Sequence, residues 1–201
     1  AAMSHPFPEE WLEECLNVYQ VENIEDLRKT NWIRLLWETL DEKVIQAEAL
    51  AESARRLCEE PDGPYIYEEA LADDLNFWRE IRRLKDTRDY DKVAETLAGH
   101  AFAKLSAKRD SSIDPFKKEQ AKELRDEEKE ICKELSTKFF NQKEEILLEL
   151  IACAREPLEG LTELTRQFKE AFSRKKREKN LLDFTDMEHF ALRILVEKVD
   201  E

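Results

Sequence analysis

The sequence predicts an all-α protein, and its composition supplies three reasons. Glycine occurs three times in 201 residues, whereas average usage is about 7%. Charged residues make up 40% of the chain, and its aliphatic residues are mostly leucine and alanine. Such residues favour helices and leave little turn chemistry for strands. The length suits one domain or one large piece of a bigger protein. We therefore expect long helices in an elongated antiparallel bundle.

Proline and capping residues define the first predicted helices. Pro6 and Pro8 introduce a short helix that reaches about Tyr19, and residues 24–29 form another. Thr30 or Asn31 then begins a long helix that ends near residue 59, before a Pro-Asp-Gly-Pro turn at residues 61–64. The apolar stripe expected along this helix comprises Leu36, Leu40, Val44, Ala47, Ala51, Ala54 and Cys58.

The next segments predict a long helix, a short one and an irregular stretch. Residues 65–87 carry an apolar side made of Leu71, Leu75, Trp78, Ile81 and Leu84, and residues 89–98 form a short helix. Residues 100–112 follow without a periodic pattern, so we expect Phe102 and Leu105 to anchor an irregular segment.

Two further long helices complete the predicted bundle. Asp114 and Pro115 begin one that runs to about residue 140. Its thin stripe comprises Leu124, Ile131, Leu135 and Phe139. The last runs over residues 143–179, and Pro157 should kink or split it because proline removes a backbone donor. Its expected seam comprises Leu147, Ile151, Ala154, Leu158, Leu161, Phe168 and Phe172.

The charge is acidic overall but unevenly distributed. The net formal charge is −14, yet residues 169–179 hold six basic and two acidic side chains. These cations are candidate phosphate contacts: Lys169, Arg174, Lys175, Lys176, Arg177 and Lys179. A second basic group comprises Lys104, Lys108 and Arg109. Such contacts would be sequence-independent and salt-sensitive. The alternative is a solvated helix end, where cations also favour the helix dipole.

Motifs of catalysis are absent from the sequence. No G-x-x-x-x-G-K-[ST], G-x-G-x-x-G or G-x-S-x-G occurs, and the three histidines lack metal-ligand spacing. The paired carboxylates at residues 127–128 and 144–145 are interpreted as helix-surface charges, since nothing in the sequence indicates burial. We expect no catalysis, cofactor or metal site in this chain. The four tryptophans are interpreted as core residues rather than base-stacking platforms.

The cysteines and the hydropathy pattern bear on the cellular compartment. The four cysteines lie far apart, so neither a disulfide nor a zinc site is expected. No run approaches the roughly 18 apolar residues of a membrane span, and no signal-like start is visible. We expect a soluble protein of a reducing cytosol with no membrane partner.

The most informative segment is residues 174–188. A basic helix end leads into Leu182, Asp183, Phe184, Asp186, Met187 and Glu188. Asp183 is a good N-cap, and Asp186 lies three residues later. This pattern resembles the segment that re-enters the motor core in UvrD-like superfamily 1 DNA helicases, with Met187 where leucine is more usual. By that resemblance, these six residues cap and dock a helix and are not catalytic.

Other segments are similar to the AddA (RexA) family of ATP-dependent helicase/nuclease subunits, in the same order along the chain. They are the opening Ser4–Leu12, Trp32 in an acidic helix, the Pro-Asp-Gly-Pro turn, Phe102–Leu105 and Lys122–Asp126. The resemblance implies a bacterial heterodimer with an AddB-type second subunit that unwinds and degrades DNA from double-strand breaks for recombinational repair. ATP and magnesium would bind in RecA-like domains outside this chain, in a protein of the bacterial cytoplasm, associated with the nucleoid.

Within such a parent, the chain resembles the helical 1B insertion of the first RecA-like domain. Residues 4–181 would form the insertion, which contacts DNA near the junction of duplex and single strands, and residues 182–201 would begin the helix that returns to the motor domain. If the motor domain is absent, we expect an exposed apolar patch around Phe184, Phe190 and Leu195. The alternative function is a stand-alone, coiled-coil-like adaptor that binds other proteins.

Overall fold

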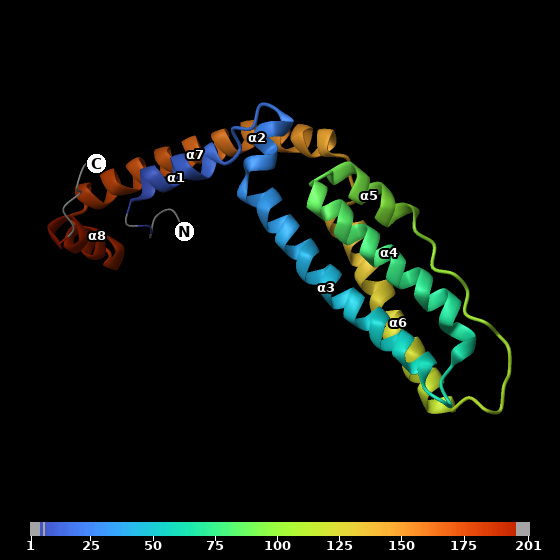
Figure 1. The fold of residues 1–201 in the computed structure, drawn as a ribbon. Helices are drawn as coiled ribbons and strands as arrows, with labels where there is room; N and C mark the ends of the chain where they lie inside the picture. Colours follow the sequence, from blue (N-terminus) through green and yellow to red (C-terminus); the bar gives the residue numbers. More distant parts are fainter. Residues whose placement is uncertain (1–4, 6, 196–201) are drawn as a thin grey trace. The chain divides into compact units, whose positions relative to one another are not determined.

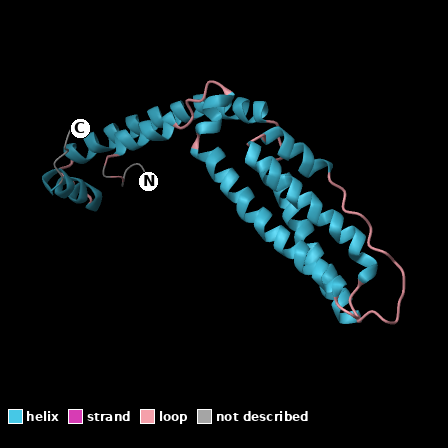
Figure 2. Cartoon of the chain, viewed as in Figure 1, coloured by secondary structure: helices cyan, strands magenta, loops and turns pink. Residues whose placement is uncertain are grey.

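The structure is a computed structural model that describes residue 5 and residues 7–195. Within these residues it contains eight α-helices and no strand, which confirms the all-α prediction (Figure 2). Ser4, Pro6 and Val196 of the predicted segments lie outside the described residues. The chain divides into two compact units, one formed by residues 27–147 and the other by residues 1–26 with 148–201. The predicted boundary at residue 182 concerns a longer protein and stays a prediction.

The unit of residues 27–147 is built around helix α3 (Asn31–Glu59). Helices α4 (Glu68–Thr87) and α6 (Pro115–Glu134) both pack along α3 (Figure 1). Helix α5 (Tyr90–Gly99) follows α4 and packs against it. A 3-10 turn, η2 (Tyr65–Tyr67), precedes α4 where the sequence predicts one continuous helix. The short helix α2 (Ile24–Lys29) leads into α3.

Helix α3 shows why this unit packs closely. Its buried positions repeat by fours and threes: Ile33, Trp37, Leu40, Val44, Ala47, Ala51, Ala54 and Cys58. Trp37 therefore occupies the buried position that the sequence analysis gives to Leu36, which is only partly buried. Its ring meets Phe140 edge-on, with 5.9 Å between centroids. The small alanines farther along let neighbouring helices approach, because the spacing between helices depends on the side chains at the contact.

Capping residues begin the helices as predicted. The hydroxyl of Thr30 accepts from the amide of Ile33, which assigns the N-cap of α3 to Thr30 rather than to Asn31. Asp89 caps α5 by accepting from the Lys92 amide, and Asp114 caps α6 by accepting from the Phe116 amide. Each cap satisfies an amide that has no partner within its own helix.

Helix α6 ends earlier than predicted. After Glu134 the chain forms a π turn, η3 (Leu135–Phe139), in which the Phe140 amide donates to the Leu135 carbonyl at 2.8 Å. The wider turn accompanies burial of both Leu135 and Phe140, whereas Phe139, predicted to be in the stripe, is only partly buried.

The second unit contains α1 (Pro8–Asn17), α7 (Glu144–Glu178), which begins four residues earlier in the first unit, and α8 (Phe184–Leu195). The predicted seam of α7 is wrong in its C-terminal half, because Leu161, Phe168 and Phe172 are exposed. The side that faces α1 is polar instead. Thr162 is buried there, and Arg166 and Lys169 both donate to Glu9.

Helix α7 also passes through Pro157 without interruption, so the predicted split does not occur. Pro157 and Cys153 are both exposed. Water can therefore hydrate the Cys153 carbonyl, which has lost its helical donor, and this lowers the cost of an interior proline.

Candidate nucleic-acid interface

The basic end of α7 closes through a defined backbone turn. Asn180 adopts the left-handed conformation, with a φ of 53°. The Leu181 amide donates to the Lys176 carbonyl at 2.9 Å, and the Asn180 amide donates to the Arg177 carbonyl at 3.1 Å. These two bonds form the Schellman arrangement that commonly ends helices. The turn fixes the direction in which the chain leaves α7 toward α8.

The first turn of α8 is held by reciprocal carboxylate caps. The Asp183 carboxylate accepts from the Asp186 amide at 2.9 Å, and the Asp186 carboxylate accepts from the Asp183 amide at 3.0 Å. The predicted capping role of both residues is confirmed. It satisfies two free amides and places negative charge at the positive end of the helix dipole.

Lys176 joins the two helices through these caps. Its ammonium donates to both Asp186 carboxylate oxygens at 2.6 and 2.7 Å and to Asp183 at 3.0 Å. The hydrogen bond from Lys176 lowers the pKa of Asp186. Desolvation opposes the charge of Lys176, but its bonds to both aspartates raise its pKa on balance. We call the arrangement of Lys176, Asp183 and Asp186 the lysine clamp. The sequence analysis proposes Lys176 as a phosphate contact and does not foresee this role.

The other cations of α7 differ in how far they are engaged. Lys169 donates to Glu9 at 2.7 Å and thereby lowers the pKa of that carboxyl, and Lys175 donates to Glu178 at 3.2 Å. Arg177 donates to the backbone carbonyl of Ser173 at 3.4 Å. Arg174 and Lys179 form no ion pair with any other described residue.

The second predicted basic group lies on residues 100–114, which connect α5 to α6 and which we call the strap. Lys104, Lys108 and Arg109 are all exposed, as predicted. Within the part of the chain that the structure describes, none of the three forms an ion pair. They belong to a different unit from the α7 cations, so the two groups are separate candidate surfaces.

The structure contains a buried polar cluster that the sequence analysis missed. The Arg125 guanidinium donates to the Asp74 carboxylate at 2.5 and 3.1 Å, with both side chains almost completely buried. Beside them, the Trp78 indole donates to Oε1 of Glu128 at 2.6 Å, while Oε2 has no partner. Burial, together with the Asp74 charge, raises the pKa of Glu128 to about 8.

The interpretation of the paired carboxylates as surface charges is therefore wrong for two of the four. Glu128 is fully buried, and Glu144 is nearly so. Glu144 receives both arms of the Arg28 guanidinium, at 2.6 and 2.7 Å. The signal that was available is spacing: Arg125 and Glu128 continue the four-and-three repeat of Ala121, Cys132 and Leu135. Their polarity concealed that repeat.

The predicted apolar patch at the end of the chain is confirmed. Phe184 is 82% exposed, Phe190 43% and Leu195 79%. Leu161, Leu164 and Phe168 on α7, in the same unit, are also exposed. A monomeric protein rarely leaves so many large apolar side chains in water, so these surfaces indicate contact with further polypeptide.

Similarity to known proteins indicates what that polypeptide is. A protein of Lachnoclostridium phytofermentans is 35% identical over 204 residues, which cover 99% of this chain. One of Bacillus pumilus is 33% identical over 97% of the chain, and one of Alkaliphilus oremlandii is 35% identical over 96%. All three are described as the AddA subunit of an ATP-dependent helicase/nuclease. No protein-family model matches the chain.

This chain is similar, over nearly its whole length, to one segment of the AddA proteins. The resemblance to the AddA family is thus confirmed. The chain spans about 15–16% of the length of these relatives.

Two kinds of feature are absent from the described residues 5 and 7–195. No helix there is long and apolar enough to span a membrane. No group of three or more histidine, cysteine, aspartate or glutamate side chains there is arranged to hold a metal ion.

Proposed function

We propose that the chain is a DNA-proximal helical segment of a longer bacterial ATP-dependent DNA helicase/exonuclease. The observation that supports this most strongly is the similarity over nearly the whole chain to proteins described as ATP-dependent helicase/nuclease subunits. The relatives' far greater length also agrees with the exposed apolar surfaces of α7 and α8, which further domains would cover. The parent would unwind and resect the ends of double-strand breaks, with ATP and magnesium bound outside this segment.

The segment would act as an arm rather than as a reaction centre. Its helices present exposed cations to sequence-independent phosphate contact, and the lysine clamp fixes how α8 follows α7. In the parent, α8 would return to a RecA-like motor domain, so the clamp would couple the arm to the motor. The parent would work in the bacterial cytoplasm at the nucleoid, with a second subunit of the AddB type.

Activity assays test this proposal. The longer protein should separate the strands of a blunt duplex only when ATP and magnesium are supplied. The 201-residue chain by itself should neither hydrolyse ATP nor cut DNA under the same conditions. A longer protein without ATP-dependent unwinding, or an isolated chain that hydrolyses ATP, would contradict the proposal and favour the adaptor function.

A further inference from the structure

The strap is held firmly against the unit of residues 27–147, although it has no regular secondary structure. At its start, the His100 ring stacks on Phe77 with 3.6 Å between centroids, and Phe102 meets both rings edge-on. At its other end, the Asp114 amide donates to the Asp62 carbonyl at 2.8 Å. Figure 2 shows the strap as the long loop between α5 and α6. Any side chain on it therefore projects from an anchored backbone.

Further bonds hold the strap between these ends. The Tyr65 hydroxyl donates to Asp110 at 2.5 Å, and Ser112 donates to the same carboxylate from its amide and its hydroxyl. These bonds lower the pKa of Asp110 to about 2, so the contact persists at any physiological pH. Leu105 packs against the core cluster that contains Tyr67 and Ala121.

A groove of about 490 Å³ runs between the strap and α6. Its lining residues are Phe102, Ala103, Lys104, Leu105, Lys122, Arg125, Asp126 and Lys129. Arg125 is neutralised by the buried Asp74. The remaining charges are three lysines and one aspartate, so the groove is basic on a chain whose net charge is −14.

The lysines of this groove are available to an anionic partner. Lys104 forms no ion pair with any described residue. Lys122 is paired with Glu119 and Lys129 with Asp126, each at 2.8 Å and each three residues apart on a partly exposed surface. Such surface pairs contribute about 0–1 kcal/mol. A phosphate group can therefore replace the carboxylate at little cost.

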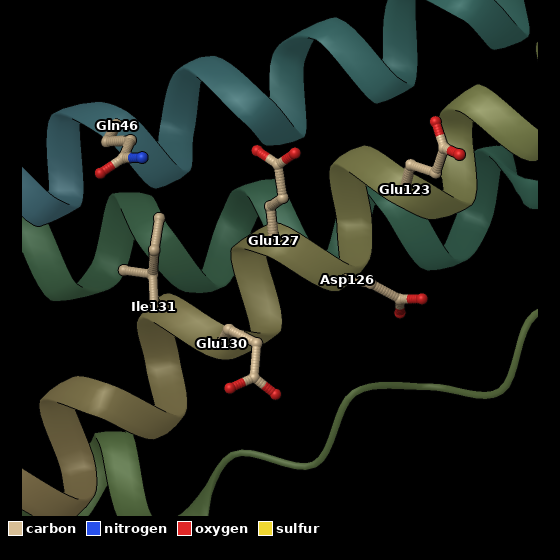
Figure 3. Close-up of a pocket in the computed structure, with 6 residues that line it drawn as sticks. All are labelled: Gln46, Glu123, Asp126, Glu127, Glu130 and Ile131. Carbon is tan, nitrogen blue, oxygen red and sulfur yellow. The ribbon is translucent and has the colours of Figure 1, made fainter.

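A neighbouring groove on α6 shows the opposite character. It measures about 590 Å³ and is lined by Gln46, Glu123, Asp126, Glu127, Glu130 and Ile131 (Figure 3). Four carboxylates and no cation line it, so it would repel a phosphate backbone. The charge difference between the two grooves distinguishes the side of α6 that can face DNA from the side that cannot.

We propose that the groove between the strap and α6 binds the sugar–phosphate backbone of DNA through Lys104, Lys122 and Lys129. This inference rests on the proposed function and extends it, because Lys122 and Lys129 are not apparent as a site from charge runs in the sequence. The exposed Lys108 and Arg109 extend the basic surface along the strap. Phe102 is partly buried against Phe77 and His100, so it supports the groove rather than stacking on a base.

The test measures binding of the 201-residue chain to a fluorescent duplex with a single-stranded tail, from about 25 to 200 mM salt, the range over which phosphate contacts lose affinity steeply. The triple variant Lys104→Gln, Lys122→Gln, Lys129→Gln is compared with the wild type. The matched control is Lys92→Gln, Lys133→Gln, Lys138→Gln, which removes the same charge from exposed positions of the same unit. Thermal unfolding followed by circular dichroism verifies that each variant is folded.

The groove variant should bind roughly ten-fold or more weakly at about 100 mM salt than the control. The slope of log affinity against log salt should fall by about 2 to 3, since each lost phosphate contact removes about 0.9. If the wild type binds but the groove variant and the control are alike, the groove assignment is overturned and the proposed function stands. If the wild type does not bind DNA even at the lowest salt concentration, both are overturned.

Discussion

Replacement of Glu128 by glutamine should stabilise the protein at neutral pH. Glu128 is fully buried beside the Asp74–Arg125 pair, so its charged form is disfavoured by desolvation and by the Asp74 carboxylate. Its pKa rises from an ordinary value of 4.5 to about 8, which means that folding at pH 7 requires this carboxylate to take up a proton. Glutamine has no charge to neutralise, and its amide oxygen can still accept from Trp78.

The magnitude follows from that pKa difference. A folded-state pKa above the unfolded value makes a contribution that is complete below pH 4.5 and is lost as the pH rises through about 8. Each pH unit in this window is worth about 1.4 kcal/mol. Relative to glutamine, the wild-type residue should therefore lose about 1 kcal/mol at pH 5.5 and about 3 kcal/mol at pH 7. The loss should level off above pH 8.

Urea unfolding at pH 5.5, 7 and 8.5, followed by circular dichroism at 222 nm, measures this difference. The free energy of unfolding of Glu128→Gln minus that of the wild type should grow with pH. Glu127→Gln is the matched control, since Glu127 is exposed on the same turn of α6 and should change little. If Glu128→Gln is less stable than the wild type at pH 7, or if the difference does not vary with pH, Glu128 is not a buried neutral acid.

Three further substitutions test other parts of the structure. Arg125→Met strands the buried Asp74 charge and should cost about 3–5 kcal/mol in urea unfolding, whereas the exposed pair broken by Lys129→Met should cost under about 1 kcal/mol; equal costs would contradict burial of the Arg125 pair. Lys176→Met removes the lysine clamp and should make amide hydrogen exchange in α8 several-fold faster, while Lys175→Met, at an exposed position, should not; unchanged exchange would show that the clamp is dispensable. Phe184→Ser with Leu195→Ser should reduce self-association of the isolated chain in analytical ultracentrifugation more than Phe116→Ser, which is exposed in the other unit; equal effects would mean that the α8 surface is not adhesive.

Local sequence signals predict most of the fold because they act over a few residues. Thr30, Asp89 and Asp114 each cap the helix that follows, and the Pro-Asp-Gly-Pro turn ends α3. The alternation of fours and threes along α3 identifies its buried side almost completely, because small and aliphatic residues occupy nearly every repeat. The capping role of Asp183 and Asp186 is visible for the same reason.

Features that depend on distant partners could not be predicted in this way. Glu128 is buried because Trp78, fifty residues earlier, supplies its hydrogen bond, and Arg125 because Asp74 neutralises it. Lys176 is one cation among several in the sequence, and only the turn at Asn180 brings both aspartates within its reach. On α7, periodicity identifies an apolar stripe correctly but cannot tell whether this unit or another part of a longer protein covers it.

The most direct test of the proposed function is the sequence of the parent gene for several hundred bases on both sides of this segment. The proposal predicts a G-x-x-x-x-G-K-[ST] phosphate loop upstream and an Asp-Glu box downstream, which would make the segment an insertion within an ATP-driven motor. A start codon close to Ser4 and a stop codon close to Glu201 would contradict it. They would leave a helical protein-binding adaptor in its place.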